Sequence, residues 1–524
     1  MNFRKESSAH AIAGCISAGL LFCVAGCGGG GQQVVGPPPD TLTLVSQSSP
    51  FPAGCDNVSP DGTNYENGEV EPWVAIDPID SSHVVGVYQQ DRWSNGSAHG
   101  LMTAVSRDRG KTWNLGFAHL SLCSGGTAGN GGNYQRATDP WVAISPNGTV
   151  FQSGLSYNES DFNEAVLVAR SSDGGDTWSD PTGLIVDTDP LVSEDKDSIT
   201  ADPHNPGDAY AIWSRYLFTD FRHQVLVSSP AWFSRTTDGG SSWETARDIY
   251  DPPAGFYALG HEIVVLPDGS LVDMFFQYDD TSSAVYTIRS TDQGLTWSQP
   301  ALIDNYTDIG VIDVKTGELV RDGVPSIAVN PTTGTLYFVW IDARFSSGLR
   351  DGIAFSMSTD GGLSWSPAVQ VNQAPNVQAF APAIAVTANG RIAITYYDFR
   401  NDNADPSVLL TNYWRITSTD GGHTWQEIPL SSSFDLRAAP KTGLGYMVTD
   451  YEGLAASAES FLAFFVAANS GNTANPTDVF ATSTEKGIGV NALTNAHIEV
   501  NFHPLTVMEQ MRLRRAERRP WLEP

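Results

Sequence analysis

The sequence predicts an all-β fold, a β-propeller of four-stranded antiparallel blades, and three observations support this fold class. An eight-residue motif, Ser/Thr-x-Asp-x-Gly-x-Ser/Thr-Trp, occurs six times in the 524 residues. Its copies recur roughly every 60 residues, a regular step that indicates a repeat architecture. Between copies lie four short runs rich in β-branched and aromatic residues, separated by turn residues, as expected for one blade per repeat.

Each position in the motif has a structural role. The six copies are centred on Asp108, Asp173, Asp238, Asp292, Asp360 and Asp420. A carboxylate at the start of a tight turn accepts hydrogen bonds from the N–H groups of that turn. The glycine supplies a positive φ, and the tryptophan is a large apolar anchor for the core. The motif therefore predicts a structural staple between the third and fourth strands of a blade.

The number of blades depends on the end of the chain. A seventh set of strands, from Asp450 to Thr482, lacks the motif and a clear fourth strand. The segment beginning at Thr41 could supply that strand and close the ring. We therefore place the propeller in residues 41–500 and prefer seven blades. Six blades, with the last strands as a terminal extension, is the alternative.

The two ends of the chain predict an anchor and a tail. A short basic region, an apolar run and Val24-Ala25-Gly26-Cys27 resemble a bacterial lipoprotein signal. We expect residues 1–26 to be removed, Cys27 to carry lipid, and the Gly/Pro-rich residues 27–40 to form a tether. This predicts a lipid-anchored protein of the cell envelope, at the outer membrane in a Gram-negative cell. Residues 501–524 form a basic tail, either solvated or bound to anionic headgroups.

Charge and cysteine content restrict the partners. The formal net charge is −30, which opposes nucleic-acid binding and favours solubility, and we expect a monomer. After processing, Cys55 and Cys123 are the cysteines that remain besides the lipidated Cys27. Outside the cytoplasm two such cysteines are expected to form a disulfide, with two separate buried thiols as the alternative.

Strand parity indicates which face carries a ligand site. Because strands alternate in direction, the starts of the innermost strands lie on the face opposite the Asp motifs. Carboxylates gather at these starts: Glu71, Asp139, Asp195 and Asp197. Oxygen ligands of this kind suit Ca²⁺, so we predict a calcium site, with local pairing of each carboxylate as the alternative.

Two further motifs lie at the end of second strands, Asp342-Ala-Arg344 and Asp398-Phe-Arg400. A planar guanidinium group can bind a substrate carboxylate in bidentate fashion. Because the motif occurs in more than one blade, structural ion pairs between loops are the alternative.

The six motifs resemble the Asp boxes of the BNR-repeat propellers, whose best-known members are the sialidases, over roughly residues 70 to 485. This resemblance implies an exo-α-sialidase that acts on a glycan at the face opposite the boxes. By similarity of local motifs, Tyr451 would be the nucleophile, Glu262 its base and Asp351 the acid. The arginines that would hold the substrate carboxylate are Arg321, Arg344 and Arg400.

Two classes of function follow from these observations. The first is a sialidase-like glycoside hydrolase, and the second is a non-catalytic propeller that binds glycan or protein, with a metal as one option. Gly323 stands where the resemblance requires the first carboxylate-binding arginine, and the predicted ligand face is acidic. We therefore expect weak or absent exo-sialidase activity.

The signal predicts that Cys27→Ser releases the protein from the membrane or leaves it unprocessed, because the substitution removes the sulfur that carries lipid. Membrane fractionation and intact-mass measurement of the mature chain test this. A variant that fractionates and migrates like the wild type would contradict the lipoprotein interpretation.

Overall fold

The computed structural model describes residues 41–58, 62–219, 225–279 and 281–483. The predicted signal (1–26), the tether (27–40), the basic tail (501–524) and the last part of the predicted propeller lie outside the described residues. The described fold is built of β-strands with two short 3₁₀ turns, η1 (Arg344–Ser346) and η2 (Leu436–Ala438), which confirms the all-β prediction.

Most strands fall into four-stranded antiparallel sets, each ordered outwards from an innermost strand. The first three sets are β3 (Val70–Ile76), β4 (Val84–Trp93), β5 (Ala98–Ser106) and β6 (Asn114–Phe117); β7 (Arg136–Ile144), β8 (Val150–Tyr157), β9 (Glu164–Ser171) and β10 (Thr182–Asp187); and β11 (Val192–Ala201), β12 (Ala209–Phe218), β14 (Ala231–Thr236) and β15 (Arg247–Tyr250). A single pairing between Ala98 and Ala137 joins the first two sets into one sheet.

Four more sets follow in chain order. They are β16 (Tyr257–Val265), β17 (Leu271–Tyr278), β18 (Ser283–Ser290) and β19 (Ala301–Tyr306); β22 (Ser326–Val329), β23 (Leu336–Asp342), β24 (Gly352–Ser358) and β25 (Val369–Gln370); β26 (Ala379–Val386), β27 (Ile392–Asp398), β28 (Leu410–Ser418) and β29 (Gln426–Pro429); and β33 (Gly453–Ala456), β34 (Phe461–Ala468), β35 (Thr477–Ser483) and β1 (Thr41–Leu44).

The remaining strands are short additions to this plan. They are β2 (Asn64–Tyr65), β13 (Leu226–Ser228), β20 (Val311–Asp313), β21 (Glu318–Val320), β30 (Phe434–Asp435), β31 (Lys441–Thr442) and β32 (Gly445–Tyr446). Strands β20, β21, β32 and β31 form a separate small sheet that the repeat pattern does not predict.

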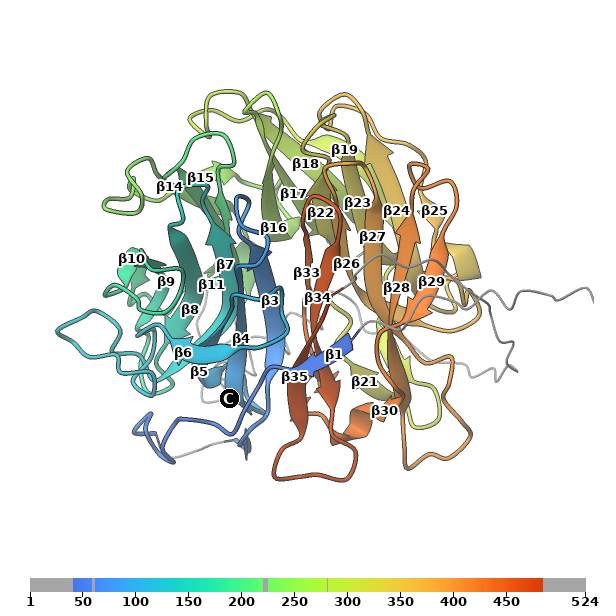
Figure 1. Cartoon of the computed structure of the whole chain (residues 1–524), viewed down its shortest axis with the longest axis horizontal. Coiled ribbons are helices and arrows are strands. Elements are labelled where there is room, and N and C mark those ends of the chain that lie inside the picture. The colour runs from blue at the N-terminus through green and yellow to red at the C-terminus, as the bar shows by residue number, and fades with distance from the viewer. Residues whose placement is uncertain (1–40, 59–61, 220–224, 280, 484–524) are drawn as a thin grey trace, which may run out of the picture. The chain divides into compact units, whose positions relative to one another are not determined.

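The innermost strands form a closed ring. Along the described chain β3 contacts β7, β7 contacts β11, β11 contacts β16, β16 contacts β22, β22 contacts β26, β26 contacts β33, and β33 returns to β3. Strand β1 pairs antiparallel with β35, so that the start of the described chain completes the last set (Figure 1). Strand β1 thus takes the fourth place in the last strand set, the place predicted for the segment beginning at Thr41.

The Asp boxes lie where the sequence places them, between the third and fourth strands. In the box centred on Asp360, the carboxylate accepts hydrogen bonds from the backbone N–H groups of Leu363 (3.1 Å) and Ser364 (2.9 Å). The hydroxyl of Ser358 accepts from Gly362 N at 2.9 Å, and Gly362 has a φ of +85°. The indole of Trp365 packs edge-on against Phe338, with ring centroids 6.1 Å apart. The staple thus joins a turn to the hydrophobic core.

Five of the innermost strands have a β-bulge near their first residues. The register shifts between Val70 and Trp73 in β3, and equivalent shifts occur in β7, β11, β16 and β26. A residue with positive φ occupies each bulge: Glu71, Asp139, Lys196, Gly260 and Ala381. Bulges of this kind redirect a side chain and are frequent near functional sites.

Within the described part of the chain, no helix has the length and hydrophobicity that a membrane crossing requires.

We expect Asp360→Ala to lower the free energy of unfolding by about 1 kcal/mol at neutral pH, because it removes hydrogen bonds that the turn replaces only partly with water. Hydrogen bonds from Ser364 and Ser358 lower the pKa of Asp360 from 3.8 to about 2, although desolvation opposes this shift. The stabilisation is therefore present above pH 4 and is lost as the pH falls through about 2.

Urea unfolding of the wild type and the variant at pH 7 and near pH 2 measures this difference. Asp176→Ala is a matched control, since Asp176 lies in another Asp box and its carboxylate forms a half-exposed ion pair with Arg107. Such a pair contributes about 0–1 kcal/mol. Equal losses for both variants at pH 7 would contradict the staple role.

Candidate functional site

A small hollow of about 20 Å³, open to solvent on one side, lies among the starts of the innermost strands. Its lining consists of Glu71, Arg92, Gly96, Ser97, Thr138, Asp139, Asp195, Lys196, Arg321 and Asp450. These residues belong to the first parts of β3, β7 and β11, to the end of β4 and its connection to β5, and to the segments before β22 and β33. The hollow is therefore on the face opposite the Asp boxes, where strand parity places a ligand site.

The ammonium group of Lys196 is the centre of the lining. Its Nζ lies 3.2 Å from Glu71, 3.2 Å from Asp139 and 2.7 Å from Asp450, and the side chain is 6% exposed. Burial lowers the pKa of Lys196, but the carboxylates of Asp139, Asp450 and Glu71 together raise it above its usual value. Lys196 is therefore expected to be a buried cation at neutral pH.

This lysine corrects the calcium prediction. Two of the proposed ligands, Glu71 and Asp139, bind the Lys196 ammonium group instead. Asp195 accepts a hydrogen bond from the Tyr216 hydroxyl at 2.8 Å, and burial raises the pKa of Asp197 well above its usual value. Among the described residues, these four carboxylates form no group with metal-ligating spacing. The positive charge that we assigned to Ca²⁺ is supplied by the protein itself.

Arg92 differs from the other cations of the hollow. It is 3% exposed, and its Nη1 donates to Gln89 Oε1 at 2.9 Å. In the part of the chain that the structure describes, its Nε has no acceptor and its guanidinium group forms no ion pair. Gln89 also donates to Glu71, whose pKa burial raises to about 8 although Lys196 opposes that shift. Arg92 can therefore donate a further hydrogen bond, and it lies beside the carboxylates that line the hollow.

The three arginines predicted to hold a substrate carboxylate do not form one cluster. Arg321 Nε donates to Asp450 at 2.7 Å. Arg344 binds Asp342 and, at 2.8 Å, Asp304. Arg400 binds Asp398 and Glu427 and stacks on Trp414, with its guanidinium carbon 3.7 Å from the ring centroid. Each guanidinium group is held by different carboxylates, so the structural ion pairs that we kept as the alternative are what the structure contains.

The predicted catalytic residues also lie in separate surroundings. The Tyr451 hydroxyl donates to the carbonyl of Pro140 at 3.1 Å, and its ring packs against Trp141 at 5.1 Å. Glu262 accepts from Ile327 N at 3.3 Å, and burial raises its pKa to about 8.

Asp351 is fully buried, and its pKa is raised well above the usual value by burial and by neighbouring carboxylates. Among the described residues, no hydrogen bond or ion pair joins any two of Tyr451, Glu262 and Asp351. Only Tyr451 is close to the hollow, where burial and then the carboxylates of Glu71, Asp139, Asp197 and Asp450 raise its pKa. The constellation that the sialidase resemblance implies therefore does not assemble.

The sequence analysis missed Lys196, the role of Arg92, and the polar groups of Ser97 and Thr138. A usable signal was present for the first of these. Lys196 stands between Asp195 and Asp197, in the strand position that Glu71 and Asp139 occupy in the two preceding sets. An alignment of the similar stretches that begin at Trp73, Trp141 and Ser198 places Lys196 at the position of Glu71 and Asp139.

Comparisons with known proteins agree with the fold. Residues 185–394 match the BNR repeat-like domain family, a range that contains the Asp boxes centred on Asp238, Asp292 and Asp360. This match confirms the predicted resemblance to BNR-repeat β-propellers. A search of curated proteins found no match.

Solved structures with a similar fold include several glycan-active enzymes. The Hadza microbial sialidase Hz136 is 14% identical, with 86% of this chain and 94% of that chain covered and a TM-score of 0.44. An α-L-arabinanase of Penicillium chrysogenum is 13% identical, with 86% and 99% covered and a TM-score of 0.44. The intramolecular trans-sialidase of Ruminococcus gnavus is 13% identical, with 83% and 97% covered and a TM-score of 0.41.

We expect Lys196→Met to lower the free energy of unfolding by about 3–5 kcal/mol, because removing one partner of a buried ion pair leaves uncompensated charge. Chemical denaturation at pH 7 measures the loss. Lys441→Met is the control, since its ion pair with Glu318 is 46% exposed on the lysine side and is expected to contribute under about 1 kcal/mol. Equal losses for the two variants would show that the ammonium of Lys196 does not organise the hollow.

Proposed function

We propose that the protein is a carbohydrate-binding propeller that recognises sugar hydroxyl groups at the hollow. The observation that carries this proposal is Arg92, a buried guanidinium group that forms no ion pair within the described residues and lies beside the carboxylates of Glu71, Asp139 and Asp195. A sugar hydroxyl group donates one hydrogen bond and accepts others. It can therefore donate to a carboxylate of the lining and accept from Arg92.

The charge of the lining favours a neutral sugar over an anionic one. Four carboxylates and three cations line the hollow. Two of the cations, Lys196 and Arg321, are already bound to Asp450. A ligand carboxylate would find one guanidinium group and several like charges, and like charges raise the free energy of a bound anion. We therefore propose neutral glycans as ligands and no exo-sialidase turnover.

We also propose that this propeller is displayed at the cell envelope. The support is the sequence Val24-Ala25-Gly26-Cys27 followed by a Gly/Pro-rich stretch. A lipid on Cys27 would anchor the chain at a membrane that faces extracellular or periplasmic glycans.

We expect Arg92→Met to weaken binding of a neutral oligosaccharide at least tenfold, because the ligand loses its charged donor. An array of neutral, N-acetylated and sialylated oligosaccharides selects the ligand, and calorimetry with the full-length mature protein measures the dissociation constant. Arg107→Gln is a matched control, since Arg107 lies in an Asp box on the opposite face and is 49% exposed. Its dissociation constant should equal that of the wild type.

Hydrolysis of a 4-methylumbelliferyl sialoside separates this proposal from the sialidase interpretation. We expect no turnover by the purified mature protein. Robust turnover that Tyr451→Phe abolishes would overturn the binding-module proposal. Binding confined to sialylated glycans, or equal binding by Arg92→Met and the wild type, would overturn the role given to Arg92.

A further inference from the structure

We propose that the Cys55–Cys123 disulfide is a redox-sensitive clasp that holds the hollow in its ligand-binding form. A dithiol reductant would open the clasp and weaken binding while the propeller stays folded. This inference rests on the carbohydrate-binding function proposed above, and it concerns the regulation of that same site.

The disulfide predicted from the sequence is present and ties the N-terminal segment to the rest of the fold. Cys55 and Cys123 are bonded with their Cα atoms 4.9 Å apart. Cys55 follows β1, which completes the last strand set, and Cys123 lies between β6 and β7. Cys55 is partly exposed, so a small reductant can reach the bond, whereas Cys123 is 8% exposed.

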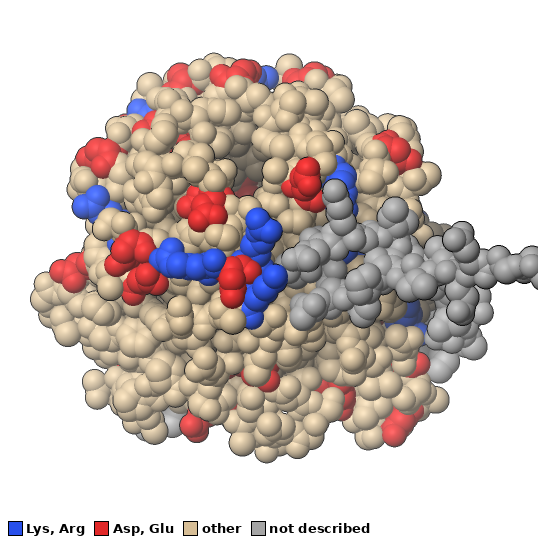
Figure 2. Space-filling model, viewed as in Figure 1, with Lys and Arg blue, Asp and Glu red and all other residues tan. Residues whose placement is uncertain are grey.

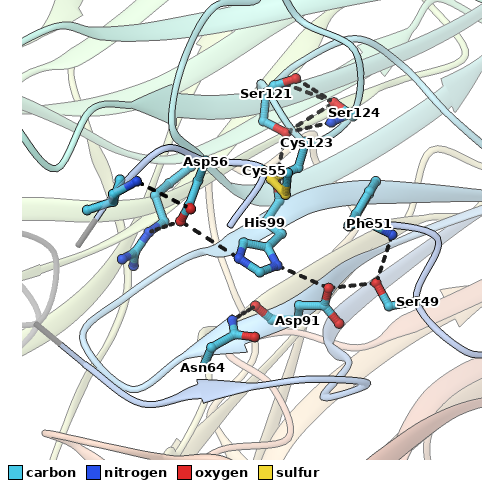
Figure 3. The surroundings of a disulfide bond; sticks show 12 residues. Ser49, Phe51, Cys55, Asp56, Asn64, Asp91, His99, Ser121, Cys123 and Ser124 are labelled. Carbon is cyan, nitrogen blue, oxygen red and sulfur yellow. Dashed lines mark hydrogen bonds and ion pairs between the residues drawn. A yellow bond between two sulfur atoms is a disulfide. The ribbon is translucent and has the colours of Figure 1, made fainter. Parts of the chain in front are cut away.

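The clasp fixes the position of Asp56, the residue next to Cys55. Its Oδ2 lies 3.7 Å from His99 Nε2 and 3.9 Å from Arg136 Nε (Figure 3). Asp56 is 2% exposed, and Arg136 is fully buried. The carboxylate of Asp56 therefore balances part of the charge of a guanidinium group that has no access to water.

Arg136 connects this carboxylate to the wall of the hollow. Its Nη1 donates to Asn95 Oδ1 at 3.1 Å and to the carbonyl of Gly96 at 3.0 Å. Gly96 and Ser97 belong to the turn between β4 and β5 and line the hollow. The guanidinium group also lies over Trp93, 4.2 Å from its ring centroid. A shift of Arg136 would therefore move the turn that carries two lining residues.

A second connection runs through His99 to Arg92. His99 Nδ1 lies 3.1 Å from Asp91 Oδ2, which also accepts from the Ser49 hydroxyl at 2.6 Å. The backbone N–H of Asn67 donates to Asp91 Oδ1 at 2.8 Å. Asp91 has a φ of +63° and directly precedes Arg92. The N-terminal segment thus holds both the turn at Gly96 and the backbone that positions Arg92.

Opening the clasp would loosen both connections. The dithiol transfers two electrons and two protons to the cystine, the S–S bond breaks, two thiols form, and the dithiol becomes a disulfide. Cys55 and Asp56 are then free to leave their positions, because the covalent constraint on their segment is gone. Without Asp56, the carboxylate that stays beside Arg136 among the described residues is Glu159, at 3.5 Å from Nη1. Because an unbalanced buried charge is costly, we expect Arg136 to shift towards Glu159.

The test compares the oxidised full-length mature protein with the same protein reduced by dithiothreitol. The first measurement is the dissociation constant of the neutral oligosaccharide that gives the strongest array signal. We expect reduction to raise it at least tenfold and reoxidation to restore it. A Cys55→Ser, Cys123→Ser double variant should bind as weakly as the reduced wild type and should not respond to dithiothreitol.

The second measurement needs no ligand. Amide hydrogen exchange over residues 91–99 should become at least tenfold faster on reduction, while exchange in β17 and β27 stays unchanged. Asp56→Asn, which keeps the disulfide, should reproduce a large part of both effects. Asp77→Asn is its matched control, because Asp77 forms a similar pair with His83 (3.1 Å) at the opposite ends of the strands.

The outcomes separate the clasp from the proposed function. Unchanged exchange over residues 91–99 in protein whose two thiols are fully alkylated overturns the clasp, and so does global unfolding on reduction. Faster local exchange together with no glycan binding by the oxidised protein supports the clasp and overturns the proposed function. An unchanged dissociation constant, despite faster exchange, overturns the control of binding by the disulfide.

Discussion

The ammonium group of Lys196 is the interaction on which the architecture of the hollow depends. It comes from β11 and binds Glu71 of β3, Asp139 of β7 and Asp450 before β33. One cation therefore joins the first, second, third and last strand sets of the ring. Burying such charges costs several kcal/mol per ion, which their attraction only offsets when the geometry is good. A network of this kind is weak support for stability, and its value lies in fixing where the four strands meet.

The backbone conformation at these positions also indicates that the charged side chains are placed at a cost in stability. Glu71, Asp139 and Lys196 all have φ values near +52°, in a region where a side chain costs about 1–3 kcal/mol. The equivalent bulges in β16 and β26 carry Gly260 and Ala381, which have little or no side chain to place. The backbone is thus strained in three consecutive strand sets, and in each of them a charged side chain faces the hollow. Figure 2 shows that acidic and basic side chains are interspersed on one face of the molecule. The distribution of charge on that face therefore does not by itself identify the site.

The sequence predicts the parts of this protein that depend on local pattern. The Asp boxes specify turns through residues at fixed offsets, and strand alternation then identifies the face opposite them. Strand alternation does not predict the position of Lys196, because regular alternation would put it on the other side of the strand from Asp195 and Asp197. The register shift in β11 cancels that alternation and brings the lysine to the acids. The Asp-x-Arg motifs are equally local, since Arg344 and Arg400 each bind the aspartate two residues before them.

The predicted catalytic trio fails for a reason that only the ring reveals. Tyr451 precedes β33, whose neighbours in the ring are β3 and β26, whereas Glu262 lies in β16, between β11 and β22. A nucleophile and its base must lie within hydrogen-bond reach. The Tyr451 hydroxyl instead donates to the carbonyl of Pro140 in β7, and Glu262 accepts from Ile327 N in β22. Local resemblance identified the stretch around each residue but carried no information on the order of blades.

Ring closure and the hollow finally depend on one segment of the chain. Strand β1 pairs with β35, and the hydroxyl of Ser46 donates to Asp478 at 2.9 Å, so the N-terminal segment completes the last strand set. The Thr477 hydroxyl of that set donates to the carbonyl of Glu69 at 2.8 Å, which joins the last set to the first. The entropic cost of closing a long loop grows only slowly with its length, by about 0.6 kcal/mol per doubling. Pairing the two ends of the domain therefore adds little to the entropic cost of folding. The same segment then continues to Cys55 and Asp56, so the chain that closes the ring also holds the wall of the hollow in place.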